Sequence, residues 1–130
     1  MSDCCGSNQK PLVYACSGGS NVGQLTNEAA KVLDDSGDAN MSCLAGLGGN
    51  ISGMVASAKS GNPLLILDGC PVACGKKIAD NLGLQNYAYV DVMSLGIKKE
   101  HNVMKTPKNE IEQVVEAGKK ALKGNNSCCS

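Results

Sequence analysis

Residues 63–68 constrain the fold more than any other part of this chain. Their sequence, Pro-Leu-Leu-Ile-Leu-Asp, is a continuous apolar run, with Gly61 shortly before it and Gly69 directly after it. A short run of this kind is typical of a strand that is buried on both faces in the middle of a parallel sheet. Both faces of such a strand must be covered, so helices are predicted on each side of the sheet.

The other apolar segments fit the same plan, in which strands alternate with helices. Further strands are predicted at residues 12–16, 40–44 and 87–93. Helices are predicted at residues 22–33, 51–59, 71–82 and 107–123, and residues 45–50 are predicted to be a glycine-rich loop. Right-handed crossovers then favour the strand order 2-1-3-4. The fold class is therefore α/β: a three-layer, Rossmann-like domain with a mostly parallel four-stranded sheet and helices on both faces.

The length of 130 residues suits one domain with one core. Residues 11–123 are expected to form that domain, and residues 1–10 and 124–130 are expected to be flexible tails that carry cysteines. Neither tail contributes to the apolar pattern that predicts the sheet.

Charge argues against several classes of partner. Twelve basic and twelve acidic residues balance, and every basic residue apart from the one histidine is lysine, so no arginine fork is available for phosphate. No apolar run approaches the about 18 residues that a membrane span needs. We therefore expect no nucleic-acid or membrane partner and a cytoplasmic location. In that compartment thiols stay reduced, so eight cysteines indicate metal or thiol chemistry rather than disulfide bridges.

Four cysteines are placed to meet at one edge of the predicted sheet. Cys16, Cys43 and Cys70 each lie at or near the C-terminal end of a predicted strand, and these ends share an edge in a parallel sheet. Cys70 is expected to cap the third helix, which puts Cys74 one turn later on the same face. Four thiolates accept Zn²⁺ tetrahedrally, so the pattern predicts a zinc site. An iron–sulfur cluster is the alternative occupant of the same ligands.

Residues beside the cysteines are expected to support them. Asp68 is predicted to accept hydrogen bonds from backbone N–H groups around Cys70, or else to be an ordinary turn residue at the strand end. Gly69 lies between these two residues. Ser17 and the glycines after it would bring backbone N–H groups close to the sulfurs. Residues 17–20 could also cradle an anion at the start of the first helix, but without a Walker lysine or a phosphatase arginine a plain helix-capping turn is favoured.

The motifs around these cysteines resemble those of the DGC domain family, which takes its name from a central Asp-Gly-Cys. The matching motifs are Ala-Cys-Ser-Gly at residues 15–18, Cys-Leu-Ala-Gly at residues 43–46 with a glycine pair at 48–49, Asp-Gly-Cys-Pro at residues 68–71, and Cys74. The resemblance covers residues 12–123. It implies zinc binding with Cys16, Cys43, Cys70 and Cys74 as the ligands, and it implies no particular reaction.

Two functions remain open at this point. The first is a zinc-binding protein whose metal is structural or is stored, sensed or carried. The second is a thiol–disulfide redox enzyme or redox sensor, in which Cys70 is the nucleophile and Cys74 or Cys16 resolves the disulfide. The C-x3-C spacing of Cys70 and Cys74 differs from the usual C-x2-C of such enzymes.

The chain ends carry two further cysteine pairs of mirrored composition. These auxiliary thiols are expected either to capture soft metal for the core site or to be harmless parts of the tails. The pairs are Cys4 with Cys5 and Cys128 with Cys129.

Overall fold

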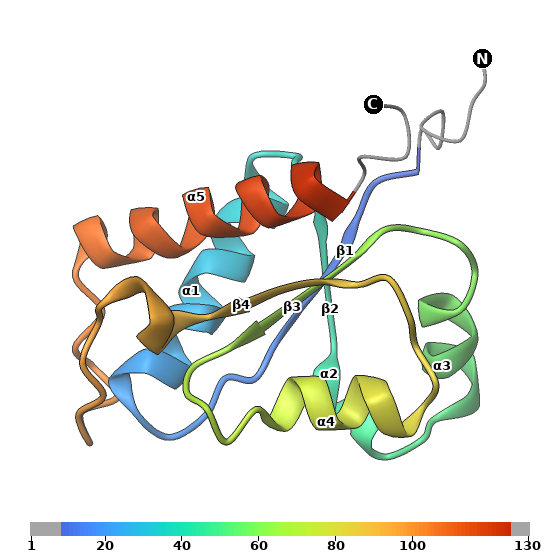
Figure 1. The fold of residues 1–130 in the computed structure, drawn as a ribbon, viewed down its shortest axis with the longest axis horizontal. Coiled ribbons are helices and arrows are strands. Elements are labelled where there is room, and N and C mark those ends of the chain that lie inside the picture. Colours follow the sequence, from blue (N-terminus) through green and yellow to red (C-terminus); the bar gives the residue numbers. More distant parts are fainter. Residues whose placement is uncertain (1–8, 126–130) are drawn as a thin grey trace.

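The computed structural model describes residues 9–125, which form a sheet between two layers of helices (Figure 1). Its strands are β1 (Leu12–Ala15), β2 (Asn40–Ser42), β3 (Leu64–Asp68) and β4 (Ala88–Asp91). All three strand pairings are parallel, and the strands lie in the order β2-β1-β3-β4. The predicted order 2-1-3-4 and the α/β fold class are therefore confirmed.

The helices divide between the two faces of this sheet. One face is covered by α1 (Asn21–Asp35) and α5 (Lys108–Asn125). The other is covered by α2 (Leu44–Gly48), α3 (Ser52–Ala58) and α4 (Cys74–Asn81). A short 3₁₀ helix, η2 (Val92–Leu95), follows β4. Within residues 9–125, no helix combines the length and the apolar character that a bilayer crossing requires.

β3 explains why the two helical layers are needed. All five of its residues are buried. Leu65 and Leu67 pack into the core beneath α1 and α5, whereas Leu64 and Ile66 pack into the core beneath α2 and α4. Each buried aliphatic side chain contributes about 1.5–3 kcal/mol relative to exposure, so both layers are stabilised by the same strand.

The prediction of a loop at residues 45–50 is wrong, because α2 begins at Leu44 and continues to Gly48. Leu44 and Leu47, which are three positions apart, are both buried against the sheet. A Cβ added at Gly46 would lie 1.8 Å from the Met54 sulfur, so a larger residue there would push the exposed Met54 side chain of α3 aside. The burial of two leucines outweighs the poor helix propensity of glycine here.

The third predicted helix also starts later than expected. The sequence favours a helix from Pro71 with Cys70 as its cap, but α4 begins at Cys74. The intervening residues form a turn in which the Ala73 N–H donates to the Cys70 carbonyl at 3.0 Å. Ala73 itself is left-handed, with φ 60°. This prediction is therefore wrong, and Cys74 is the first residue of the helix rather than a residue one turn inside it.

Candidate functional site

The C-terminal edge of the sheet carries the four cysteines of interest. Cys16 directly follows β1, Cys43 directly follows β2 and Cys70 lies two residues beyond β3. Cys74 opens α4 at the same edge. The strand register, with Tyr14 beside Ser42 and Ile66, brings the strand ends level with one another.

Cys16 is half-buried at the end of β1, close to Thr26 of α1. Its N–H donates to the Leu67 carbonyl of β3 at 3.0 Å, and its Sγ lies 3.7 Å from the Thr26 hydroxyl. The same hydroxyl donates to the Gly23 carbonyl at 2.6 Å and accepts from the Ser17 N–H at 3.1 Å. Thr26 therefore connects the end of β1 to α1, a role that its position in the sequence gave no reason to expect.

Ser17 adopts a left-handed conformation, with φ 51°. Its hydroxyl donates to the Asn27 side-chain oxygen at 3.0 Å. The helix cap is supplied by another residue, because the Ser20 hydroxyl accepts from the Gly23 N–H at 3.1 Å. Ser17 thus shapes the turn between β1 and α1 through its backbone and Asn27.

Cys70 is half-buried and packs against the core on the α1 and α5 side. The Lys99 ammonium lies 3.6 Å from its sulfur. Asn21 holds the Lys99 segment in place, since its side chain donates to the Lys98 carbonyl at 2.8 Å and accepts from the Glu100 N–H at 2.5 Å. A positive charge is thereby placed beside the Cys70 sulfur by a segment that is distant in sequence.

Gly69 lets the end of β3 approach α1 closely. A Cβ at this position would lie 2.7 Å from the Gly23 nitrogen and 2.8 Å from the Val22 carbonyl carbon. Both contacts are with backbone, which cannot move aside cheaply. The glycine of the Asp-Gly-Cys motif is therefore required by packing between β3 and α1.

Asp68 is buried at the end of β3 and accepts three hydrogen bonds. Its Oδ1 accepts from the Gly75 N–H at 2.8 Å, and its Oδ2 accepts from the Lys76 N–H at 3.0 Å. The Tyr89 hydroxyl of β4 also donates to Oδ2, at 2.8 Å. The N–H groups that Asp68 bonds are thus those of the first turn of α4, immediately after Cys74, rather than those around Cys70.

Tyr89 is a further residue at this edge that the sequence pattern does not indicate. Burial raises the pKa of its hydroxyl, and the hydrogen bond to Asp68 raises it further, so the phenol stays protonated and keeps donating. The Lys76 ammonium lies 5.3 Å from the centre of the Tyr89 ring. A tyrosine in a strand gives no sequence signal for this role, which depends on β4 lying beside β3.

The four sulfurs do not form a ready-made coordination sphere. Among residues 9–125, no three His, Cys, Asp or Glu side chains are grouped so that they could hold a metal ion. Cys16 packs on the α2 and α4 side of the sheet and Cys70 on the opposite side, while Cys43 and Cys74 are exposed. The four-thiolate site therefore stays a prediction. The terminal pairs lie outside the described residues: Cys4, Cys5, Cys128 and Cys129.

Comparison with known proteins identifies the family. The family model of the DGC domain matches residues 12–117. A protein of Pseudomonas aeruginosa, the anaerobic and virulence modulator AnvM, is 45% identical over 91 residues, which is 70% of this chain and 70% of that protein. No solved structure matches the chain. The family match spans both the sheet and the edge that carries the four cysteines, so the chain belongs to the DGC domain family.

Proposed function

We propose that this protein binds one zinc ion through the thiolates of Cys16, Cys43, Cys70 and Cys74. The observation that carries the proposal is their placement on adjacent elements at one edge of the sheet. Neighbouring strands lie about 4.8 Å apart, and rotation about the single χ1 bond swings each sulfur through a wide arc. Binding one ion would therefore draw Cys16 and Cys70 round the strand ends, from the opposite faces on which they pack, toward Cys43 and Cys74.

The chemistry of the donor set fits zinc. Zn²⁺ accepts four cysteine sulfurs tetrahedrally at about 2.3 Å. Such a site carries a net charge of about −2, which needs a compensating group nearby. The Lys99 ammonium, 3.6 Å from the Cys70 sulfur, supplies one positive charge at this position. In the proposed site, Lys99 would therefore balance part of the negative charge of the four thiolates.

The proposed role of the metal is handling or sensing in the cytoplasm, alongside a structural contribution. A filled four-thiolate site leaves no position for a water molecule, so it is unsuited to hydrolysis. The Pseudomonas relative is named as an anaerobic and virulence modulator, which supports a regulatory use of such a site over a purely architectural one. Zinc thiolates release their metal when the sulfurs are oxidised, and this chemistry suits a sensor.

The test is elemental analysis of the full chain, purified reduced and without oxygen. We expect about one zinc per chain, and we expect Cys70→Ser and Cys74→Ser each to lose it. The matched control carries the same substitution at the four terminal cysteines and should keep its zinc: Cys4, Cys5, Cys128 and Cys129.

Other outcomes would contradict the proposal in recognisable ways. Iron with equimolar sulfide and visible absorbance would identify an iron–sulfur cluster. A folded, metal-free protein in which Cys70 and Cys74 form a reversible disulfide would favour the thiol–disulfide function. If zinc were lost only from the variant in which the four terminal cysteines are replaced, the metal would be bound outside the sheet edge.

A further inference from the structure

The described part of the chain enters the sheet at the N-terminal edge, opposite the edge that carries the four cysteines. The Asn62 side chain donates to the Lys10 carbonyl at 3.0 Å, and the Leu12 N–H donates to the Pro63 carbonyl at 2.9 Å. Asn62 and Pro63 directly precede β3. The two bonds therefore hold the start of β1 beside the start of β3.

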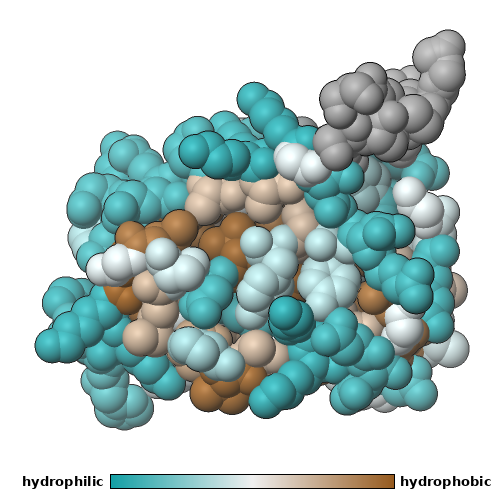
Figure 2. All heavy atoms as spheres, in the orientation of Figure 1, coloured by the Kyte–Doolittle hydropathy of each residue, from teal (hydrophilic) through white to brown (hydrophobic). Residues whose placement is uncertain are grey.

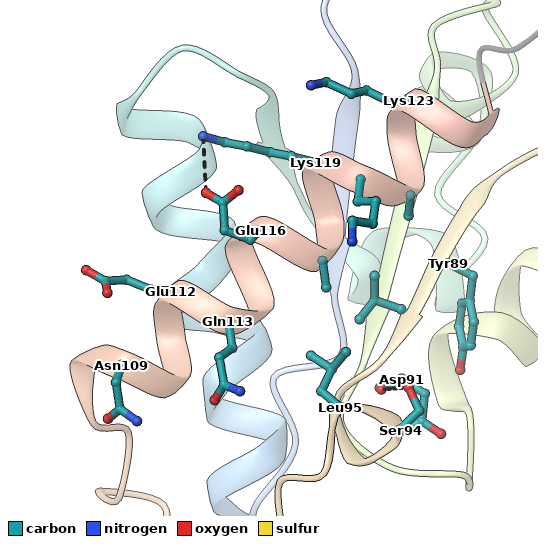
Figure 3. Close-up of a pocket in the computed structure, with 14 residues that line it drawn as sticks. Tyr89, Asp91, Ser94, Leu95, Asn109, Glu112, Gln113, Glu116, Lys119 and Lys123 are labelled. Atoms are coloured by element: carbon teal, nitrogen blue, oxygen red, sulfur yellow. Dashed lines mark hydrogen bonds and ion pairs between the residues drawn. The ribbon is translucent and has the colours of Figure 1, made fainter.

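The described part of the chain also ends at this edge. The side chain of Asn125, the last residue of α5, donates to the Asn86 carbonyl in the segment before β4. In Figure 3, α5 runs from Asn109, at the level of η2, to Lys123, beyond Tyr89 of β4. Figure 1 shows the start of β1 and the end of α5 on the same side of the molecule. The fold thus brings its first and last described residues to one edge.

One hollow connects the segments that hold these two ends. It has a volume of about 530 Å³ and is lined by residues from the end of α3 to the start of β3, by residues 83–86 and by Asn125. β1 and β4 flank β3, and neighbouring strands are about 4.8 Å apart, so the starts of β1 and β4 are about 10 Å apart. The two ends of the described chain therefore lie close together.

The terminal cysteine pairs lie outside the described residues, but only a short length of chain joins them to it. Cys5 is four residues before Gln9, and Cys128 is three residues after Asn125. At no more than about 3.5 Å per residue, these cysteines lie within about 14 Å and about 10 Å of those two residues. The opposite edge is farther away, because β3 alone covers about 17 Å. The two pairs are thus placed to meet each other rather than the four cysteines at the sheet edge.

The surroundings of the hollow supply no competing metal ligand. The residues that line it include amide side chains and one charged side chain, Lys59, but no histidine, aspartate or glutamate. Figure 2 shows a hydrophobic strip along α5 and β4, away from the corner where the described chain ends. An ion bound at this corner would therefore depend on thiolates, and Lys59 would offset part of their negative charge.

We infer that the two terminal pairs together bind one Cu(I) ion at the N-terminal edge of the sheet. Soft thiolate ligands select Cu(I), which needs fewer of them than the tetrahedral set of four that Zn²⁺ requires. A disulfide within a pair of adjacent cysteines is strained, so the thiols stay available. This copper site is separate from the zinc site proposed for the opposite edge. Its ligands come from both pairs: Cys4 and Cys5, and Cys128 and Cys129.

The fold should strengthen binding because it ties both pairs to the same edge. Once one pair holds the ion, the second pair is present at an effective concentration in the millimolar range. We therefore expect the joint site to bind Cu(I) about 100-fold more tightly than either pair alone.

The test is a titration of the full chain with Cu(I), reduced and without oxygen, against the chromogenic chelator bicinchoninate. Three variants replace cysteine by serine: the first pair, the second pair, and all four terminal cysteines. At a chelator concentration that only the joint site can overcome, each variant should bind one Cu(I) ion fewer than the full chain. The same loss should appear when the four serines are added to Cys70→Ser with Cys74→Ser, so the result does not depend on the zinc site.

An equimolar mixture of the two single-pair variants provides the decisive measurement. It should not regain the ion at micromolar protein, because its two intact pairs are on different chains and lack the common anchor. Circular dichroism establishes that every variant is folded. Equal copper content in the full chain and the four-serine variant, an ion kept by either pair alone, or a mixture that regains the ion would each overturn the inference.

Discussion

Replacing Asp68 with asparagine tests whether this carboxylate holds the start of α4. Asparagine has nearly the same shape but only one acceptor oxygen. The carboxylate accepts from the Gly75 and Lys76 N–H groups and from the Tyr89 hydroxyl, at 2.8, 3.0 and 2.8 Å. In either orientation, the new NH₂ group of the amide faces a backbone N–H, so at least one donor of the helix start loses its partner.

The expected cost follows from these contacts. Losing one hydrogen bond to a charged group costs about 1.5–3 kcal/mol, and the remaining bonds weaken by about 0.5–1 kcal/mol because the acceptor is no longer charged. We therefore expect Asp68→Asn to lower the free energy of unfolding by about 3 kcal/mol. For a chain of this size that corresponds to a fall in Tm of about 12 °C.

Urea unfolding followed by circular dichroism measures this change, with the midpoint falling and the slope unchanged. The matched control is Asp91→Asn, because Asp91 is the register partner of Asp68 and, within residues 9–125, its carboxylate accepts from the Met93 N–H alone, at 3.0 Å. That variant should lose about 0.5–1 kcal/mol. Equal losses in the two variants, or a loss under about 1 kcal/mol for Asp68→Asn, would refute the role assigned to Asp68.

Further predictions concern packing and one tyrosine. Gly75→Ala should lower the free energy of unfolding in urea titrations by about 2 kcal/mol, because the added Cβ would lie 2.8 Å from the Asp68 carboxylate. The control, Gly53→Ala, adds its Cβ in open space and should be neutral or stabilising. Burial and the bond to Asp80 raise the pKa of Tyr87 to about 12 from 10.0 in the unfolded chain. The raised pKa of Tyr87 therefore stabilises the fold fully below pH 10, and this stabilisation is lost as the pH rises toward 12. Tyr87→Phe should flatten the dependence of the free energy of unfolding on pH over that range, and an unchanged dependence would argue against the shift.

The architecture could be predicted because its determinants are local. β3 is an uninterrupted apolar run, and helices follow three strands at regular spacing, so handedness rules leave few arrangements of the sheet. The placement of cysteines at strand ends followed from the same pattern. α2 was missed because glycine propensity is a local property, whereas the burial of Leu44 and Leu47 depends on packing against the sheet.

The details of the site depend on contacts that the sequence does not reveal. Tyr89 reaches Asp68 from a neighbouring strand, and Lys99 reaches Cys70 only because Asn21 holds its segment. The start of α4 is likewise fixed by the carboxylate of Asp68 rather than by Pro71. The Tyr89 and Lys99 contacts join parts of the chain that become neighbours only after the sheet has formed, so spacing and propensity could not predict them. The Asp68 contacts with α4 are local and depend instead on the left-handed turn at Ala73.

The parallel sheet also determines when the cysteine edge can assemble during folding. Cys16, Cys43 and Cys70 follow the ends of three successive strands, and these strand ends come side by side only after β1 has paired with both β2 and β3. Parallel pairings join distant parts of the chain and therefore form slowly, whereas a C-x2-C knuckle is complete within one turn. The edge is thus a late product of folding, and until it forms each of these thiols is exposed separately to oxidants and to free metal.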